Sequence, residues 1–440
     1  MEGQLLKTIV SAILFVLLLV SVFMGAVSHQ LVKVNANSQG EVVQAADADW
    51  WPMFHHDLSH TGTSTSTAPT TNNVLWTYMT VGRVESSPAV VGGLVFVGSI
   101  DDNVYCLNAV TGAHVWNYTT GGIVYSSPAV AGGLVYVGSF GPEDSVYCLN
   151  ASNGDFVWSY ATYGYVFSSP AVVGGLVYVG SEDYSVYCLN ATTGTLVWSY
   201  KTGGDVDSSP AVVGGLVFVG SGDDNVYCLN ATTGAQVWNY TTRSNVFSCP
   251  AVVGGLVYIG SYDASVYCLN ATSGAPIWSY TTGSIVDSCP AVVGGLVYVG
   301  CDDSSVYCLN ATTGALVWSY KTGFDVTSSP AVVDGLVYVG SLDYSVYCLN
   351  ATTGALVWSY ETGGPVGSSA AVANGVVYVG SEDGKIYAFG PSSAVPEFPS
   401  FLILPLFMMT TLLATFILLK RKRNARTQRA LFPKFRVIIC

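Results

Sequence analysis

The sequence predicts an all-β fold, an eight-bladed β-propeller whose blades each have four antiparallel strands. Three observations predict it. A Ser-Ser-Pro tripeptide or a near copy recurs every 40 residues, with one two-residue insertion near Gly141. Tryptophan recurs at the same period, and each marker occurs eight times. The composition (48 Gly and 28 Tyr in 440 residues, 10% charged) favours strands over helices or disorder. A period of about 40 residues with several strands per repeat is typical of propeller blades.

Each repeat divides into four short strands. In the repeat that contains Ser328, the expected strands are 329–333, 336–340, 346–349 and 356–360. Asp334-Gly335 joins the first two, where most other repeats have Gly-Gly. These pairs favour a type I′ turn because both central residues need a positive φ.

The ends of the array predict a closed ring. The last repeat ends at 386–389 without a tryptophan strand, whereas a strand with Trp76 precedes the first Ser-Ser-Pro. We expect 74–80 to complete the last blade, which removes two exposed sheet edges.

Two uncharged apolar runs, 9–27 and 401–419, flank the repeats, and each is long enough to cross a bilayer as a helix. Small residues after the first run favour cleavage of a signal peptide over an uncleaved anchor. The expected division is 1–30 signal peptide or N-terminal anchor, 31–73 lead-in, 74–390 propeller, 391–399 linker, 400–419 transmembrane helix and 420–440 basic tail.

Charge separates by region. Residues 36–398 hold five basic and 27 acidic residues, a net charge of −22, whereas 420–440 hold eight basic residues and no acid. The acidic body excludes nucleic-acid binding and suits cations or basic partners. The basic cluster predicts a cytoplasmic tail, with the propeller outside the cell.

A motif links the chain to a known family. Cys348, Asn350, Thr353-Gly354 and Trp358 follow the spacing of the docking motif in pyrroloquinoline-quinone-type repeats, usually Ala-x-Asp-x-x-Thr-Gly-x-x-x-Trp. The chain resembles this family over about residues 50–390. The resemblance implies a docking role for Trp76, Trp116, Trp158, Trp198, Trp238, Trp278, Trp318 and Trp358.

The family of pyrroloquinoline-quinone-type repeats includes quinone-dependent dehydrogenases and non-enzymatic assembly scaffolds. Its dehydrogenases hold the quinone in the central channel with Ca²⁺, a catalytic Asp, a stacking Trp and usually a disulfide between adjacent cysteines. This chain has no Cys-Cys pair, and Trp50 and Trp51, its only tryptophans outside the docking positions, precede the propeller. We therefore expect no cofactor.

The C-terminus carries a second resemblance. Pro396-Glu397-Phe398-Pro399, an apolar run and a basic cluster resemble the Pro-Glu-Phe sorting signal of archaeal surface proteins, although a long tail follows Arg423. This resemblance implies an archaeal protein at the cell surface.

Carboxylates gather on one predicted face. The turns between second and third strands carry Asp101, Asp183, Asp223, Asp263, Asp303, Asp343 and Asp383, with Glu143-Asp144 in the inserted repeat. They either stabilise the turns through backbone hydrogen bonds or bind cations or basic ligands. No metal site is assigned.

One position varies while its neighbours stay fixed. The residues before each Ser-Ser-Pro should surround the channel mouth on the acidic face, either as a ligand site or as unconstrained loop ends. The candidate residues are Glu85, Tyr125, Phe167, Asp207, Phe247 and Asp287, followed by Thr327 and Gly367.

The opposite face carries Asn-Ala-Thr turns. Their asparagines serve as turn formers, as glycan acceptors, or as both. The candidate glycosylation sites are Asn150, Asn190, Asn230, Asn270, Asn310 and Asn350 in these turns, with Asn117 and Asn239 on fourth strands.

Cysteine and histidine have structural interpretations. Seven cysteines occupy the third-strand position, where adjacent blades are too far apart for disulfides, so they should be buried. Cys289 and Cys301 share a hairpin, which makes a bridge between them an alternative. His55, His56 and His60 should pack or lie on the surface rather than bind metal.

The sequence therefore predicts a non-enzymatic, membrane-anchored binding or scaffold platform. Its expected partners are cell-surface proteins, glycans or cations. Two alternatives stay open: a quinone- or metal-dependent dehydrogenase-like enzyme at the channel mouth, and a purely structural envelope protein.

Overall fold

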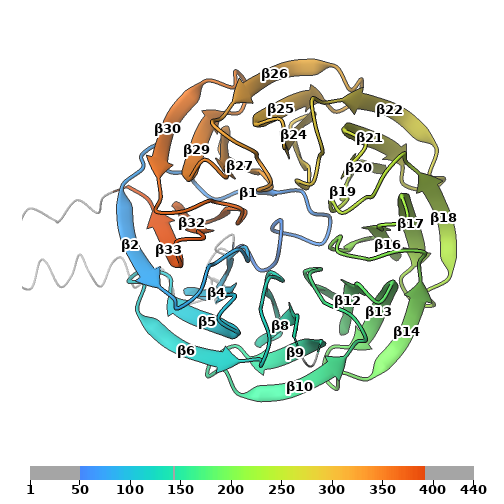
Figure 1. Cartoon of the computed structure of the whole chain (residues 1–440), viewed down its shortest axis with the longest axis horizontal. Coiled ribbons are helices and arrows are strands. Elements are labelled where there is room, and N and C mark those ends of the chain that lie inside the picture. The colour runs from blue at the N-terminus through green and yellow to red at the C-terminus, as the bar shows by residue number, and fades with distance from the viewer. Residues whose placement is uncertain (1–49, 142–143, 392–440) are drawn as a thin grey trace, which may run out of the picture. The chain divides into compact units, whose positions relative to one another are not determined.

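The structure is a computed structural model that describes residues 50–141 and 144–391. Within these ranges the chain forms a ring of eight sheets with their strands nested from the centre to the rim (Figure 1). The prediction of an eight-bladed, four-stranded antiparallel propeller is confirmed. No helix in the described ranges is long and apolar enough to cross a membrane. The predicted signal peptide, transmembrane helix and basic tail lie outside the described residues.

In blades 1 to 7 the four strands run outward in chain order, and in blade 8 the N-terminal β2 takes the outer place. Blade 1 has β3 (Ala89–Val91), β4 (Leu94–Gly98), β5 (Asn103–Asn108) and β6 (His114–Thr119); blade 2 has β7 (Ala129–Ala131), β8 (Leu134–Ser139), β9 (Ser145–Asn150) and β10 (Phe156–Ala161); blade 3 has β11 (Ala171–Val173), β12 (Leu176–Ser181), β13 (Ser185–Asn190) and β14 (Leu196–Lys201); blade 4 has β15 (Ala211–Val213), β16 (Leu216–Gly220), β17 (Asn225–Asn230) and β18 (Gln236–Thr241).

The second half of the ring repeats this order. Blade 5 has β19 (Ala251–Val253), β20 (Leu256–Ser261), β21 (Ser265–Asn270) and β22 (Pro276–Thr281); blade 6 has β23 (Ala291–Val293), β24 (Leu296–Cys301), β25 (Ser305–Asn310) and β26 (Leu316–Lys321); blade 7 has β27 (Ala331–Val333), β28 (Leu336–Gly340), β29 (Ser345–Asn350) and β30 (Leu356–Glu361), joined by β1 (Thr63–Ser64); blade 8 has β31 (Ala371–Ala373), β32 (Val376–Gly380), β33 (Lys385–Phe389) and β2 (Val74–Met79).

Ring closure follows the predicted route. β2 pairs antiparallel with β33, and Trp76 lies opposite Ala388, as the other docking tryptophans lie opposite the third-strand cysteines. The N-terminal strand therefore completes the blade formed by the last three strands. The tight inner hairpins have the positive φ angles that type I′ turns need, as at Asp334 (49°) and Gly335 (74°).

The hydrophobic core lies between neighbouring blades. The interface of blades 3 and 4, for example, buries Cys188 and Trp198 against Val217 and Leu229. The indole N–H of Trp198 donates to the Ala231 carbonyl of the next blade at 2.9 Å. A Cβ at Gly234, whose φ is 71°, would meet this indole at 2.7 Å, so the Thr-Gly turn admits only glycine. Seven of the eight tryptophans dock in this way, whereas Trp358 donates to the Pro69 carbonyl of the lead-in.

Candidate functional site: the mouth of the propeller

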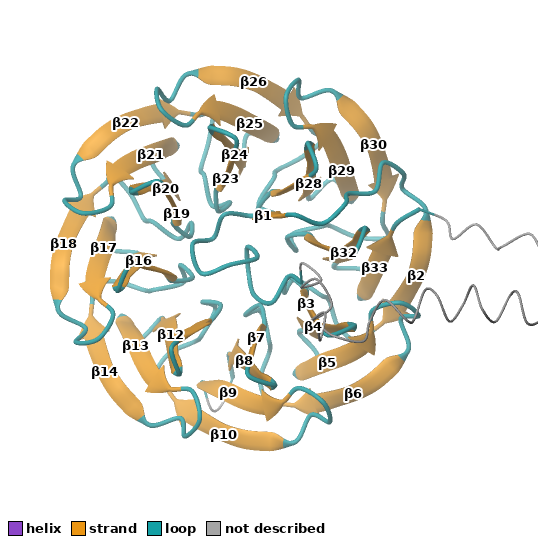
Figure 2. Ribbon diagram, turned by 180° about the vertical axis from the view of Figure 1, so that it is seen from behind, coloured by secondary structure: helices purple, strands orange, loops and turns teal. Residues whose placement is uncertain are grey.

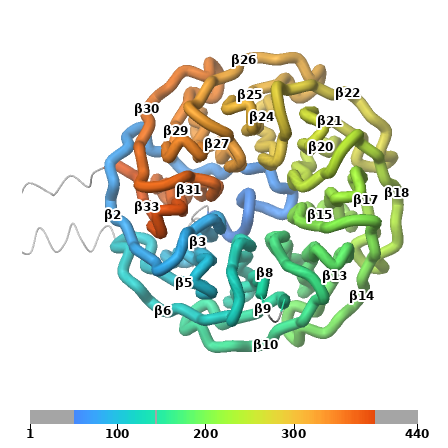
Figure 3. The backbone as a smooth tube through the Cα atoms, in the orientation of Figure 1, coloured from blue at the N-terminus to red at the C-terminus, as the bar shows by residue number. Residues whose placement is uncertain are grey.

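Residues 50–64, here called the central segment, wind around the middle of the ring (Figures 2 and 3). Trp51 exchanges two backbone hydrogen bonds with Val90 of blade 1, at 2.9 and 2.7 Å. Further along, the carbonyls of Pro52, Leu58, Ser59, Thr61 and Gly62 accept hydrogen bonds from the inner-strand amides of Val130, Val212, Val252, Val292 and Val332. The segment therefore engages the inner strands of six blades in turn.

The central segment buries four of its large side chains. Trp51, Met53, His55 and His60 are each at most 7% exposed. Burial lowers the pKa of His55 to about 3, helped by the nearby His60, and lowers the pKa of His60 to about 4. Both imidazoles are neutral at physiological pH and act as packing groups. Within the described residues, no group of three or more His, Cys, Asp or Glu side chains is placed to hold a metal ion.

The Ser-Ser-Pro repeats build a ring of hydrogen bonds around the axis. The second residue of each repeat donates its backbone N–H to the side-chain oxygen or sulfur of the equivalent residue in the next blade, at 2.9–3.4 Å. The first serine accepts the N–H of the glycine that ends the neighbouring strand, as Ser86 does from Gly98 at 2.9 Å. The members of the ring are Ser87, Ser127, Ser169, Ser209, Cys249, Cys289, Ser329 and Ser369. These bonds explain why Ser-Ser-Pro or a near copy recurs in every repeat.

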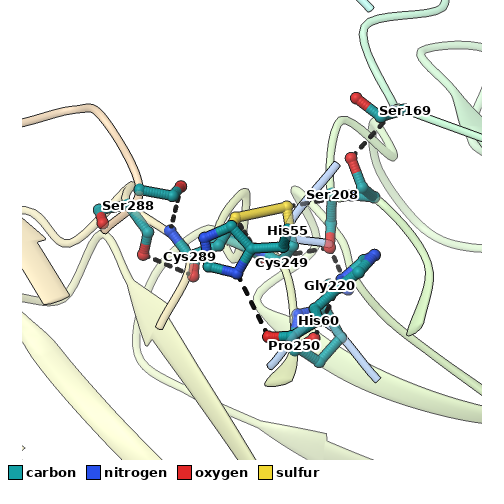
Figure 4. Close-up of a disulfide and its surroundings, with 12 residues drawn as sticks. His55, His60, Ser169, Ser208, Gly220, Cys249, Pro250, Ser288 and Cys289 are labelled. Atoms are coloured by element: carbon teal, nitrogen blue, oxygen red, sulfur yellow. Dashed lines mark hydrogen bonds between the residues drawn. A yellow bond between two sulfur atoms is a disulfide. The ribbon is translucent and has the colours of Figure 1, made fainter. Parts of the chain in front are cut away.

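A disulfide joins Cys249 to Cys289 within this ring (Figure 4). The alternative of a Cys289–Cys301 bridge is wrong, because Cys301 is a free buried thiol. Equivalent residues of adjacent blades are only 4.8 Å apart (Cα–Cα) at this pair near the axis, which suits a disulfide. The seven third-strand cysteines, farther from the axis, are free and buried, and burial raises their pKa to about 11 or 12.

The turn aspartates are tied into the blades. Asp223 Oδ2 accepts hydrogen bonds from the Tyr227 hydroxyl and from the Gly203 amide, both at 2.6 Å. Burial alone would raise the pKa of this carboxyl, but the hydrogen bonds outweigh it and the net pKa is lowered. Asp101, Asp303 and Asp383 follow the same pattern, including the lowered pKa. We call these four residues the clamp aspartates.

The residues before Ser-Ser-Pro have partners that the sequence did not reveal. In several blades the residue that follows the second strand lies beside the candidate residue of the next blade, as Glu182 lies beside Asp207 and Glu382 beside Glu85. Tyr262 packs its ring edge-to-face on Phe247, with centroids 5.1 Å apart, and hydrogen-bonds Asp287. A Cβ on Gly222 would lie 3.2 Å from the Phe247 ring. This second set comprises Ile100, Glu182, Gly222, Tyr262, Asp302, Leu342 and Glu382, each directly before a turn aspartate, and Phe140, which precedes Gly141 in the inserted repeat. We call the two sets together the mouth residues.

Blades 3 to 6 form the acidic part of the mouth. Burial raises the pKa of Asp207 to about 7, reinforced by Glu182, Asp205 and Asp287. Burial likewise raises the pKa of Asp287 and of Asp302 to about 6, with Asp302 acting on Asp287 and Asp325 acting on Asp302. Within the described residues, Asp207 Oδ1 and Asp302 Oδ1 are buried without a hydrogen-bond partner. These carboxylates repel one another, and the clamp aspartate Asp303 adds to the repulsion at Asp302.

Blades 2 and 3 form an aromatic part. Tyr125 and Phe167 lie 5.3 Å apart (ring centroids), and Phe140 packs on both, at 6.1 and 5.6 Å. Tyr165 closes the cluster with its ring centroid 4.3 Å from that of Phe140. All four rings keep some solvent exposure. The structure therefore brings Tyr125 and Phe167 together, and places the acidic candidates Asp207 and Asp287 in a different part of the mouth.

The remaining candidates lie in blades 7, 8 and 1. Burial raises the pKa of Glu85 to about 7, helped by Glu382, and Arg83 opposes this shift. Arg83 forms a 2.9 Å ion pair with Glu382. Thr327 and Gly367 lie side by side, since a Cβ on Gly367 would be 3.7 Å from Thr327 Oγ1. The mouth is therefore unequal around the ring, although the blades beneath it are nearly identical.

The opposite face has well-ordered turns. Asn190 Oδ1 accepts hydrogen bonds from the amides of Thr192 and Thr193, at 3.0 and 2.9 Å. Asn230, Asn270, Asn310 and Asn350 accept the two equivalent amides, whereas Asn150 accepts the amide and the hydroxyl of Ser152. On the fourth strands, Asn117 and Asn239 donate their amide nitrogens to Asn103 and Asn225. The six turn asparagines thus have a structural role whether or not they carry glycans.

The residues at the centre do not fit a quinone cofactor. The central segment occupies the middle of the ring, and the eight blade tryptophans pack between blades. The disulfide joins two cysteines that are 40 residues apart in the sequence and belong to different blades. No adjacent-cysteine disulfide can form, since the sequence has no Cys-Cys pair. We derive no reaction through a quinone.

Comparison with known proteins agrees with this architecture. Residues 58–256 match the family described as beta-alanine-activating enzyme, beta-propeller, and residues 262–394 match the family described as outer membrane protein assembly factor BamB. No curated protein matches the chain. The fold and its repeats define an eight-bladed propeller of docked tryptophan motifs. These matches, together with the fold, support a propeller family of PQQ-like repeats.

Solved structures share the fold at low sequence identity. BamB from Moraxella catarrhalis is 18% identical, with a TM-score of 0.64 over 73% of this chain and 100% of that one. Quinohemoprotein alcohol dehydrogenase from Comamonas testosteroni is 16% identical, with a TM-score of 0.68 over 81% and 82%. A europium-containing methanol dehydrogenase is 15% identical, with a TM-score of 0.66 over 78% and 98%. A shared fold does not show whether a protein is an assembly factor or a dehydrogenase.

Proposed function

We propose that this chain is an exported, membrane-anchored binding platform whose mouth recognises cationic groups of a cell-surface partner. The platform is non-enzymatic. The observation that carries the proposal is the acidic part of the mouth, where Asp207, Asp287 and Asp302 lie close together and two of their oxygens are buried without a partner.

The chemistry of these residues favours an ammonium or guanidinium group. A cation among the three carboxylates would relieve their repulsion and supply hydrogen bonds to the unpaired oxygens. Phe247 and Tyr262 add aromatic rings beside them, which attract cations through their faces. Lysine and arginine side chains of a protein carry such groups, so a basic protein segment is the partner that this chemistry favours.

Export and anchoring rest on other features. The apolar runs 9–27 and 401–419 and the basic cluster after the second run support a membrane protein with its propeller outside. The Cys249–Cys289 disulfide supports an oxidising compartment for the propeller. The Asn-x-Ser/Thr turns on the opposite face would place any glycans away from the mouth.

The test uses the full-length chain purified in detergent and a fluorescent octalysine peptide as the probe. Asp207→Asn/Asp287→Asn neutralises two mouth carboxylates, and Asp155→Asn/Asp334→Asn removes the same charge from exposed turns outside the acidic face. Asn374 already fills the Asp334 position in blade 8, so this control should fold normally. We expect the mouth variant to weaken binding about tenfold, which corresponds to ~1.4 kcal/mol. The control should change binding less than about twofold. Equal losses in both variants would contradict a mouth site, because they would show attraction to net charge alone.

A further inference from the structure

We propose that the Cys249–Cys289 disulfide is a redox-sensitive clasp that fixes the central segment against blades 5 and 6. This inference does not depend on what the mouth binds.

The position of the two cysteines singles them out. In the ring of hydrogen bonds around the axis, six of the eight members are serines and two are cysteines. The two cysteines lie in adjacent blades, the only arrangement in which two members of the ring are close enough for a disulfide. The ring does not need sulfur, because serines at the other positions make the same N–H to side-chain contact. The disulfide therefore adds a covalent link to a ring that hydrogen bonds already close. Among the described residues it is the only link of this kind between blades.

The disulfide lies where the central segment crosses blades 5 and 6. Directly after Cys249, the Pro250 carbonyl lies 3.2 Å from His60 Nδ1 (Figure 4). The Val252 amide then donates to Ser59 O at 2.8 Å, and the Val292 amide donates to Thr61 O at 2.9 Å. The bridge therefore ties together the two inner strands, β19 and β23, that hold residues 59–61.

The same bridge also joins two mouth loops. Phe247 and Asp287 stand two residues before the bridged cysteines. Cys249 and Cys289 are 5% and 4% exposed, so attack by a small dithiol requires only a modest opening of the ring. Oxidation thus fixes both the central segment and part of the mouth.

Reduction by a dithiol is chemically balanced and structurally mild. The dithiol gives two electrons and two protons, the S–S bond breaks, two Cys thiols form, and the dithiol becomes a disulfide. Each thiol can then serve the ring as a serine hydroxyl does in the other blades. We expect local loosening of the central segment and not loss of the propeller. Because the bridge closes a span of 40 residues, its loss should also lower Tm by about 5 °C.

The experiment measures hydrogen exchange and Tm of the full-length chain with and without dithiothreitol. Cys249→Ser/Cys289→Ser restores the serine found in six blades, and Cys301→Ser changes a buried free thiol in blade 6 as the matched control. In wild type, dithiothreitol should speed exchange of the Val252 and Val292 amides about tenfold and lower Tm. The double serine variant should show the fast exchange already and ignore dithiothreitol, whereas Cys301→Ser should respond like wild type.

Two results would overturn the clasp. One is unchanged exchange in wild type after mass spectrometry shows that both thiols are free. The other is a double serine variant that exchanges as slowly as oxidised wild type. Should the double variant fail to fold, the response of wild type to dithiothreitol decides the question alone.

Discussion

Asp223 and Asp207 belong to the same blade and the same face, yet the fold treats them in opposite ways. Asp223 accepts hydrogen bonds from Tyr227 and Gly203, and its pKa is lowered. Asp207 has a buried oxygen without a partner and three acidic neighbours, and its pKa is raised to about 7. The clamp aspartates stabilise the propeller, whereas the mouth carboxylates are held at a cost to it. Such a cost is typical of functional sites.

The largest expected effect comes from removing a clamp. Asp223→Ala leaves the Tyr227 hydroxyl, whose residue is 7% exposed, and the Gly203 amide without their acceptor, which should cost about 3 kcal/mol. Asp207→Ala should leave stability at pH 8 unchanged or raise it. Thermal unfolding of the two variants measures the difference. Equal losses would show that the two aspartates are equivalent, against our comparison.

The second prediction concerns pH. The pKa of Asp207 is about 7 in the fold against an ordinary 3.8, so the folded chain holds more protons between these values. Stability from this group is therefore present at low pH and lost as pH rises through 7. Asp207→Asn should stabilise the protein by about 2 kcal/mol at pH 8 and by much less at pH 4.5. A Tm gain that is the same at both pH values would argue against the raised pKa.

The third prediction separates the mouth from the central segment. His55 and His60 have pKa values near 3 and 4 in the fold, below the ordinary 6.5, so their contribution is present above pH 6.5 and lost as pH falls. At pH 5.5 the protonation of each histidine in the unfolded chain should lower the free energy of unfolding by about 1 kcal/mol. The mouth carboxylates oppose this loss, so acid should destabilise Asp207→Asn/Asp287→Asn more than wild type. Melting curves between pH 7 and 5.5 test this, and a smaller loss in the variant would contradict it.

The smallest effect is expected on the opposite face. Asn190→Asp keeps the oxygen that caps the Thr192 and Thr193 amides, so stability should change by less than about 0.5 kcal/mol. The substitution also removes a candidate glycan site. Mass spectrometry of the protein from its native host would show whether a glycan is lost. A large drop in Tm without any glycan would mean that the amide nitrogen has a structural role.

The repeats made the fold predictable. Eight copies of one pattern average out local ambiguity, and the missing tryptophan strand of the last repeat predicted that β2 would close the ring. The central segment was not predicted, because residues 50–64 occur once and have no repeat to compare. Its contacts join the segment to inner strands far away in the sequence, such as Leu58 to Val212.

The site was predictable only in part. Comparing repeats identified Glu85, Asp207 and their equivalents, and the same comparison at the residue before each turn aspartate could have identified Tyr262 and Asp302. The adjacent Ser-Cys-Pro repeats likewise carried the signal for the disulfide. What the sequence could not supply is the difference between Asp207 and Asp223. That difference depends on which carboxylate finds a donor and which meets other acids.

The most direct test of this account is the pKa of the Asp207 carboxyl in the intact chain. Carbon-13 NMR of protein labelled at aspartate Cγ, with Asp207→Asn identifying the signal, can follow its titration. We predict a pKa of about 7 in the free protein and a clear decrease when octalysine is bound. A pKa near the ordinary 3.8, unaffected by the peptide, would contradict the claim that the mouth carboxylates serve to bind a cationic partner and not to stabilise the fold.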